Sequence, residues 1–520
     1  MLLALLLYLA PLTLIAAAIH ASRTPGLHPR PTLRVAEGAA LAALGVAAAA
    51  VVGLIAAGPA AMPTLGAAGL GLSARLDVVS ATMLLLVAFV GWVVLRYAAT
   101  YLDGDPRQGA FTGWLCATLA AVMLFVTAGN LLQLVAAWIA TSLFLHRLLL
   151  HYPDRVAARR AARKKFVTAR LGDAAVVAAA FVMVLTYGTG DIATILIGAR
   201  IGEGVEAAPW IAGLLALAAL LKSAQFPTHG WLTEVMETPT PVSATLHAGV
   251  INAGGFLLIR FADVLLLSPA VLAVLAMIGG VTALFGGLAM LTQSAVKTSL
   301  AWSTVAQMGF MILQCGLALF PLALLHIVAH SLYKAHAFLA SGTAVDVVAA
   351  IRRPGPVAVP GPGAVALAFV VALVIYGLIG LVFGFDGKSP QAVALGAILI
   401  FGIAYLLAQG FADAAPAMLT RRTALYAAAA AVGYFALQRL SEWLTAGTLP
   451  PTPVPGPLEW AVIVLAVASF GLVAVAQAMF PLWAYHPAAA GLRVHLSNGL
   501  YMNAVFDRLV GGWTHGGDAR

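Results

Sequence analysis

Charged residues are scarce in this chain, and cysteine is almost absent. Only 9% of the 520 residues are charged, 62% are hydrophobic, and the mean hydropathy is +0.99. A soluble domain usually has about 25% charged residues, so the composition excludes a soluble globular protein and predicts an integral membrane protein. Cys116 and Cys315 both lie in apolar runs and form no CxxC pair. The sequence therefore contains no disulfide framework and no iron–sulfur pattern.

The net charge of +9 lies mostly in short segments between apolar runs. Basic loops are retained in the cytoplasm, so this charge predicts membrane topology, and no nucleic-acid partner is expected. The N-terminus is apolar from its second residue and has neither a basic leader nor a clear cleavage site. We therefore interpret it as a first helix and not as a signal peptide.

Apolar runs of about 20 residues, the length needed to cross a bilayer, recur along almost the whole chain. The fifteen candidate spans are Leu2–Ile19, Ala36–Ala57, Asp77–Ala99, Ala110–Thr127, Leu131–Leu150, Leu171–Gly188, Trp210–Phe226, Val242–Ala262, Pro269–Leu291, Val296–Leu319, Leu322–Ala349, Ala364–Phe385, Ala392–Ala412, Ala424–Leu437 and Leu458–Phe480. The expected fold class is an all-α polytopic membrane protein with about 13 to 15 transmembrane helices.

Four basic loops follow odd-numbered spans and therefore share one side of the membrane. Their residues are Arg23, Arg30 and Arg34; Arg155, Arg159, Arg160, Arg163, Lys164, Lys165 and Arg170; Arg352 and Arg353; and Arg421 and Arg422. This pattern predicts an N-terminus outside the cytoplasm and a cytoplasmic C-terminal tail. The stretch from Arg159 to Lys165 could in addition bind anionic membrane lipids.

Lys222 stands at the end of the apolar run Ile211–Leu221, and Pro227 interrupts the helix shortly after it. Proline removes a backbone donor and breaks a helix. An ionisable side chain beside a broken helix at membrane depth is typical of an ion path, although a lysine at a helix end can also reach the membrane surface. We assign four residues to a broken-helix and gating segment: Pro227, His229, Glu234 and Glu237. The two glutamates could equally be simple interfacial charges.

His326, His330 and Lys334 are spaced so that they lie along one face of a helix. Histidine titrates near neutral pH, so this polar stripe, together with Lys222 and His247, predicts a proton relay. The pair His326 and His330 could instead bind a metal ion, but no carboxylate or cysteine lies near it in the sequence and Lys334 would repel a cation. His247 by itself would more often be a buried core histidine.

Three further charges have two possible roles each. Lys297 begins a span and is either a loop charge that sets topology or a relay group. Asp173 follows the basic loop and is either a charge at a helix start or a relay carboxylate. Lys388 ends a span, where it would ordinarily be a loop lysine.

Several long motifs occur in an order that resembles the antiporter-like proton-translocating family. That family includes subunit L of NADH–quinone oxidoreductase and the large subunits of multisubunit cation/proton antiporters. The motifs are KSAQFPTHGWL, PTPVSATLHAG, KTSLAWSTVAQMGFM and HIVAHSLYKAHAFLASG. The resemblance, from about Asp77 to Lys388, implies two inverted repeats with broken helices. It also implies a relay made of Lys222, His247, Lys297, His326, His330, Lys334 and Asp173, with Lys388 as the terminal lysine of the second broken helix.

The family layout implies five parts. They are the N-terminal transmembrane helices (1–109), the first antiporter-like repeat (110–262), the second repeat (263–415), the C-terminal transmembrane helices (416–484) and a cytoplasmic tail (485–520).

Two departures favour a shorter branch of the family. Relatives carry a glutamate after the tryptophan of the fifth span, where it pairs with the central lysine, whereas Ile139 follows Trp138 here. The chain also has little sequence after Phe480 for the long lateral helix of subunit L. The sequence is similar to the DabB branch, the membrane subunits of DAB inorganic-carbon complexes in the bacterial inner membrane.

That resemblance implies a cytoplasmic partner of the DabA type, a zinc protein similar to β-carbonic anhydrases. A flow of protons or sodium ions through the membrane subunit would drive conversion of CO2 to bicarbonate in the partner. The chain itself is then expected to be a transporter subunit without a cofactor and not an enzyme. The tail and the basic loop are predicted docking surfaces. The alternative is a proton-translocating subunit of a complex I-like or Mrp-type antiporter complex.

Overall fold

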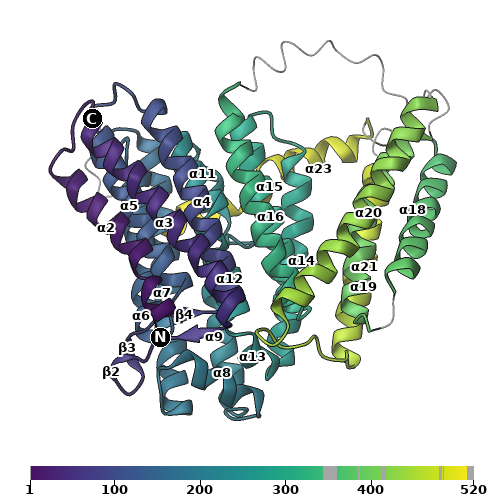
Figure 1. The fold of residues 1–520 in the computed structure, drawn as a ribbon. Coiled ribbons are helices and arrows are strands. Elements are labelled where there is room, and N and C mark those ends of the chain that lie inside the picture. Colours follow the sequence, from purple (N-terminus) through teal and green to yellow (C-terminus); the bar gives the residue numbers. More distant parts are fainter. Residues whose placement is uncertain are drawn as a thin grey trace.

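The computed structural model describes residues 2–343, 360–384, 387–411, 417–479, 483 and 485–511. These residues are almost entirely helical (Figure 1). Within the described ranges, eleven helices are long and apolar enough to cross a membrane, and Ala208–Lys222 and Pro390–Ala404 are shorter apolar helices. Each of the fifteen predicted spans coincides with a helix over its described part, so the all-α polytopic fold class is confirmed. Arg352 and Arg353, the third predicted basic loop, lie outside the described residues.

Among the described residues, short strands lie in the first part of the chain, and the later elements are helices. The first part contains α1 (Leu2–Leu6), α2 (Leu9–Ser22), α3 (Arg30–Ala57), β1 (Ala60–Ala61), β2 (Leu65–Ala67), β3 (Leu70–Leu72), β4 (Arg75–Leu76), α4 (Val78–Tyr101), α5 (Gln108–Val126), α6 (Leu131–Leu149), α7 (Val156–Tyr187), α8 (Ile192–Arg200) and α9 (Ala208–Lys222). The middle contains α10 (Gly230–Glu234), η1 (Val235–Glu237), α11 (Thr240–Ala248), η2 (Val250–Asn252), α12 (Ala253–Arg260), α13 (Ala262–Leu266), α14 (Pro269–Met290), α15 (Val296–Gly316), α16 (Phe320–Leu339) and η3 (Ala340–Thr343). The last part contains α18 (Pro362–Phe383), α19 (Pro390–Gly410), α20 (Ala417–Thr445), α21 (Pro457–Ala478), α23 (Pro487–Ser497), η4 (Gly499–Tyr501) and α24 (Met502–Gly511).

Polar caps explain where several helices begin. Asp77 and Ser80 form a capping box at the start of α4, and Asn130 accepts a hydrogen bond from the backbone N–H of Gln133 at the start of α6. These side chains satisfy backbone donors that a helix start leaves free. Between α3 and α4, β1 pairs with β4 and β2 pairs with β3, in both cases antiparallel.

The helices form three groups side by side (Figure 1): α1 to α13, then α14 to α16, then α18 to α21. Glycine permits the close packing of α14 against α15. A Cβ atom added to Gly279 of α14 would lie 2.4 Å from the backbone nitrogen of Leu313, and one added to Gly309 of α15 would lie 2.4 Å from that of Ala283. The two backbones therefore touch directly, as small residues allow between membrane helices.

The basic segment after the fifth span is helical, which corrects the prediction of a loop. Helix α7 begins at Val156 and not at Leu171, because alanine, arginine and lysine are strong helix formers. Within it, the side chains of Lys164 and Lys165 are buried, with only 1% and 4% exposure. These two lysines are therefore internal groups and not loop charges.

The C-terminal segment folds back over one end of the bundle. The Nζ atom of Lys164 lies 2.6 Å from Oδ1 of Asp507 and donates to Oδ1 of Asn503 at 3.0 Å. Asn503 in turn donates to Glu234 of α10. Gly499 lies so close to Trp302 that an added Cβ would be 3.1 Å from its ring. The tail and the basic segment, each predicted as a docking surface, thus bind each other.

The tail and the N-terminal helix lie at opposite ends of the bundle. Helix α24 contacts α7 and α10, whereas α1 contacts β1 and β4. The strands adjoin the other end of α7, since Gly190 donates its backbone N–H to the carbonyl of Ala68.

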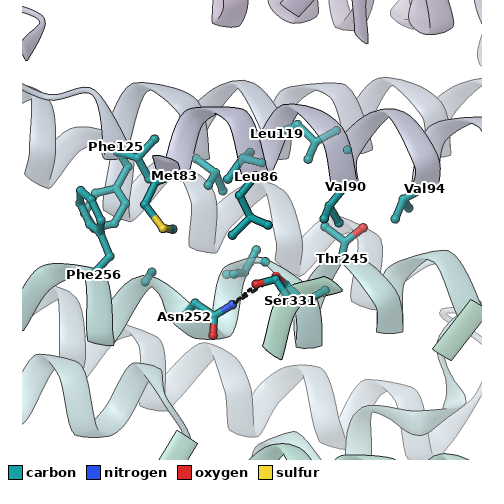
Figure 2. Close-up of a pocket in the computed structure, with 18 residues that line it drawn as sticks. Met83, Leu86, Val90, Val94, Leu119, Phe125, Thr245, Asn252, Phe256 and Ser331 are labelled. Atoms are coloured by element: carbon teal, nitrogen blue, oxygen red, sulfur yellow. Dashed lines mark hydrogen bonds between the residues drawn. The ribbon is translucent and has the colours of Figure 1, made fainter. Parts of the chain in front are cut away.

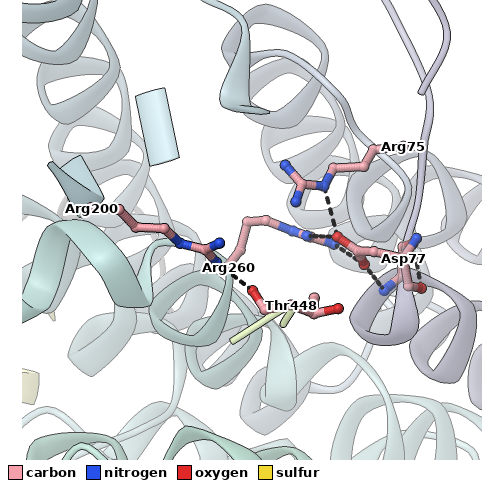
Figure 3. A network of polar contacts seen from close by, with 6 residues as sticks. Arg75, Asp77, Arg200, Arg260 and Thr448 are labelled. Atoms are coloured by element: carbon pink, nitrogen blue, oxygen red, sulfur yellow. Dashed lines mark hydrogen bonds and ion pairs between the residues drawn. The ribbon is translucent and has the colours of Figure 1, made fainter. Parts of the chain in front are cut away.

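A buried carboxylate ties the strands to two helices (Figure 3). Asp77 Oδ2 accepts from Nη1 of Arg260 at 2.5 Å and from Nε of Arg75 at 2.7 Å. Beside it, Arg200 Nε donates to Oδ1 of Asp263 at 2.8 Å, and Nη2 donates to the carbonyl of Thr448 at 2.7 Å. The network joins α4, α8, α12 and α13 at the end of the bundle that holds the strands.

Replacing Asp77 by alanine leaves the buried guanidinium of Arg260 and the partly buried guanidinium of Arg75 without their carboxylate. We expect the variant to lose about 3 kcal/mol of stability, since removal of one partner of a buried ion pair strands the other charge. The midpoint of thermal unfolding in detergent measures this. Asp103→Asn is the matched control, because its contact with His28 is exposed and should contribute little. Equal midpoints for the two variants would show that the network is not a stabilising element.

Glu234→Gln tests the docking of the tail. The amide cannot form an ion pair with Lys164, so we expect cleavage within residues 485–511 by a dilute protease to accelerate about tenfold, equivalent to ~1.4 kcal/mol. Glu237→Gln is the control, since in the described part of the chain Glu237 pairs only with Arg155 and both side chains are about half exposed. An unchanged cleavage rate in Glu234→Gln would mean that this contact does not hold the tail.

Candidate functional site

Lys222 ends α9 at a break in the helix, as predicted. Ala224 has a φ of +50°, the Phe226–Pro227 peptide bond is cis, and helical structure resumes only at Gly230. The Lys222 side chain is 8% exposed. Its Nζ donates to Oγ of Ser142 at 2.8 Å and lies 4.4 Å from the centroid of the Trp138 ring. The hydroxyl and the aromatic face both stabilise a positive charge away from water.

No carboxylate among the described residues forms an ion pair with Lys222. Ile139, which occupies the position of the family's glutamate, is a partly buried hydrophobic residue. The carboxylate whose charge acts on Lys222 is that of Asp173 in α7. Asp173 is itself held by Arg170, with Nη2 of the arginine 2.6 Å from Oδ2. The direct contacts of the Lys222 ammonium described above are therefore a hydroxyl group and an aromatic ring.

His247 connects two helices at the next break, where α11 ends and η2 follows. Its Nδ1 lies 2.9 Å from Oγ1 of Thr304, and its ring stacks on Phe338 with centroids 4.4 Å apart. The Thr304 hydroxyl donates to the carbonyl of Leu300, which also accepts from Nζ of Lys334 at 3.0 Å. His247 and Lys334 are thus linked through the Thr304 hydroxyl and this shared carbonyl oxygen.

The predicted polar face of α16 is present. His330 Nε2 donates to the backbone carbonyl of His247 at 3.2 Å, and the ring centroids of His326 and His330 are 6.0 Å apart. His326 Nδ1 donates to Oε1 of Gln314 at 2.9 Å. Lys334 is completely buried. His326, His330, Lys334 and His247 therefore form one continuous cluster.

Asn252 joins the Lys222 region to α16, and sequence reasoning missed it. Its Nδ2 donates to Oγ of Ser331 at 2.9 Å, beside a cavity of about 30 Å³ (Figure 2). Ser223, next to Lys222, donates to the carbonyl of Ile251 at 3.0 Å. The signal in the sequence was an asparagine within the apolar stretch after His247.

Several buried polar atoms along this route have no hydrogen-bond partner among the described residues. They include Gln225 Oε1, His229 Nδ1, His247 Nε2, Asn252 Oδ1, His326 Nε2 and His330 Nδ1. Most buried polar groups in proteins are hydrogen-bonded to protein or to ordered water. The protein interior along α9, α11 and α16 therefore offers hydrogen-bonding groups to buried water molecules.

The gating segment lies under the tail. The ring of His229 is buried in an aromatic box, with its centroid 5.0 Å from that of Trp302, 5.5 Å from that of Phe285 and 5.8 Å from that of Phe226. Glu234 pairs with Lys164 at 2.8 Å, whereas Glu237 is exposed. Of the two glutamates, only Glu234 belongs to the internal polar network.

Lys297 and Lys388 stand apart from the relay cluster. Lys297 is partly exposed near the start of α15 and forms no hydrogen bond or ion pair within the described chain. Lys388 lies in the turn between α18 and α19, and not in a break within one helix as the resemblance implied. Its Nζ donates to Oε1 of Gln438 at 2.9 Å. Burial, assisted by the charge of Arg439, lowers the pKa of Lys388 to about 8, so it can exchange protons near neutral pH.

Metal ligands are not grouped in this part of the molecule. Within the described ranges, no three histidine, cysteine, aspartate or glutamate side chains are placed to hold one metal ion. His326 and His330, the pair considered for a metal site, are engaged with Gln314 and the backbone of His247.

Known proteins are similar to this chain in sequence and in fold. The profile of the family described as NADH:quinone oxidoreductase/Mrp antiporter, TM, matches residues 128–389, and that of NADH-ubiquinone oxidoreductase (complex I), chain 5 N-terminus, matches residues 63–112. The chain is 37% identical to the probable inorganic carbon transporter subunit DabB2 of Halothiobacillus neapolitanus, over 97% of this chain and 93% of that one.

Two other relatives are similar over about half of each chain. The probable inorganic carbon transporter subunit DabB of Hydrogenovibrio crunogenus is 46% identical over 51% of this chain and 52% of that one. NADH-quinone oxidoreductase subunit L of Escherichia coli is 34% identical over 54% and 46%. Among solved structures, a chain of the Mrp complex from Dietzia sp. superposes with a TM-score of 0.65 at 24% identity, covering 98% of this chain and 59% of that one; this likeness concerns the fold alone. The chain belongs to the antiporter-like proton-translocating family of membrane subunits, together with the DabB proteins, subunit L and the Mrp antiporters.

Proposed function

We propose that this chain is the ion-conducting subunit of an inorganic-carbon uptake complex in a bacterial inner membrane. The observation that supports an ion path is the series of buried polar side chains between Lys222 and Lys334, which includes Asn252, His247 and His330. Buried ionisable groups are costly in a membrane and mark ion pathways. The similarity to DabB2 along nearly the whole chain supports inorganic carbon as the coupled substrate.

In this proposal, protons or sodium ions flow down their gradient and drive hydration of CO2 to bicarbonate in a partner subunit. The partner is a DabA-like zinc protein of carbonic-anhydrase type on the cytoplasmic side, and the zinc belongs to that partner. The tail lies at the end of the bundle opposite α1, which fits an N-terminus outside and a cytoplasmic tail. The basic first turns of α7 would also face anionic membrane lipids there.

The absence of a glutamate at Ile139 favours passive flow over pumping. Relatives with that glutamate can hold or release the central lysine by charge pairing. Here Lys222 is held by the neutral partners Ser142 and Trp138. Neutral partners attract the charged lysine more weakly than a carboxylate does. Lys222 is therefore not held strongly in its protonated form, and a gradient can move protons through this site.

The second candidate is a proton-translocating subunit of a complex I-like or Mrp-type antiporter complex. The match of the family profile to residues 128–389 and the fold shared with the Mrp chain favour it.

Purification of the complex from its native membrane separates the two candidates. We expect a stoichiometric zinc protein to co-purify, with zinc measured by elemental analysis. Flavin or iron–sulfur clusters in its place would overturn the inorganic-carbon assignment and favour the second candidate.

Lys222→Ala and Lys334→Ala should each abolish inorganic-carbon uptake without loss of assembly of the complex. Each substitution removes a proton-carrying group from the proposed ion path. The measurement is growth of a carbonic-anhydrase-deficient host in ambient air, with the partner subunit co-expressed. Lys297→Ala is the matched control, since Lys297 lies outside the cluster, and should support growth. Full growth of either of the first two variants would show that the route is assigned incorrectly.

A further inference from the structure

A second buried lysine meets Lys222 at a single residue of α6. The Nζ atom of Lys165 donates to the backbone carbonyl of Ser142 at 2.7 Å, while Nζ of Lys222 donates to Oγ of the same serine at 2.8 Å. Lys165 is 4% exposed and Ser142 is 1% exposed. The two amines come from α7 and α9, and Ser142 holds them side by side.

The charges around this pair do not balance. Asp173 is the one carboxylate of the described chain that acts on both lysines, and it is already paired with Arg170 at 2.6 Å. His146 of α6 also faces Lys165. With both lysines protonated, three cations would share one buried carboxylate. Like charges confined at low dielectric disfavour joint ionisation, so such groups release and bind protons as a coupled pair.

We propose that Lys165 is the proton-exchange partner of Lys222. It takes the place of the glutamate that pairs with the central lysine in relatives, at the position where this chain has Ile139. The inference rests on the proposed function, with protons as the conducted ion. In the exchange, the ammonium of Lys165 loses a proton and the neutral amine of Lys222 gains one. The pair keeps a single positive charge throughout, and no bond between heavy atoms changes. Ser142 holds the two nitrogens in position.

The position of Lys165 provides the connection to the aqueous side. Its neighbour Lys164 is paired with Glu234 and Asp507 under the tail. Lys165 is therefore one residue away from the contacts that hold the tail, and its own side chain reaches Ser142 beside Lys222. A proton that enters near Glu234 reaches Lys165 first, and the exchange passes it toward the cluster around His247.

The alternative is that Lys165 only ties α7 to α6. Two substitutions separate these roles. Lys165→Gln keeps a hydrogen-bond donor but cannot carry a proton. Lys165→Arg keeps the positive charge and the donor, but a guanidinium does not release its proton at accessible pH. A structural tie would tolerate at least one of the two, whereas a proton-exchange partner tolerates neither.

The experiment uses the complete complex in liposomes, with proton uptake down an imposed pH gradient followed by an internal pH-sensitive dye. We expect Lys165→Gln and Lys165→Arg each to slow proton flux at least about tenfold, equivalent to ~1.4 kcal/mol. Arg163→Ala is the control, because it removes an exposed cation from the same helix. We expect this variant to leave the proton flux unchanged.

The outcomes distinguish this inference from the proposed function. Wild-type flux in Lys165→Gln or Lys165→Arg, with Lys222→Ala inactive, overturns the role of Lys165 and leaves the proposed function standing. Wild-type flux in Lys222→Ala overturns both. Recovery of flux when Ile139→Glu is added to Lys165→Gln supports the exchange role, because a carboxylate then replaces the missing partner. Each variant is compared at equal amounts of assembled complex, determined by co-purification.

Discussion

The burial of ammonium groups inside an apolar bundle is the constraint on which the rest of this structure depends. A lysine away from water needs hydrogen-bond acceptors and dipoles close to its nitrogen, or it loses its charge. Lys222 obtains them from Ser142 and Trp138 on α6, and Lys334 from the carbonyl of Leu300 on α15. Each contact joins two helices, so the positions of the lysines and the packing of the bundle are set together.

Interrupted helices supply the polar backbone that these side chains require. The break after α9 and the short η2 segment after α11 both lie inside protein, where freed backbone groups find partners. The carbonyl of Ile251 accepts from Ser223, and the carbonyl of His247 accepts from His330. Regular helices would have used those carbonyls within their own turns. The kinks are therefore part of the polar route and not local defects.

Basic residues have two different uses in this molecule. Arg159 and Arg163 are exposed on the first turns of α7, as charges that set membrane topology should be. Lys164 and Lys165, in the same run of sequence, point inward and bind Glu234 and Ser142. Helical geometry explains the difference, because neighbouring positions on a helix of 3.6 residues per turn face different directions. The Lys164 contacts also hold the tail against the bundle.

The sequence by itself determined the membrane-spanning helices, the break at Pro227 and the shared face of His326, His330 and Lys334, because each follows from local composition or from the period of one helix. Its similarity to relatives also determined the family. Only the tertiary structure decided that Lys165 and Lys222 meet at Ser142, and that Asn252 reaches Ser331. The hydrogen bonds from Lys165 to Ser142, from Lys222 to Ser142 and from Asn252 to Ser331 join residues that are 23, 80 and 79 positions apart in the chain. Which side chains meet across such separations depends on how whole helices pack, and neither hydropathy nor motif spacing contains that information.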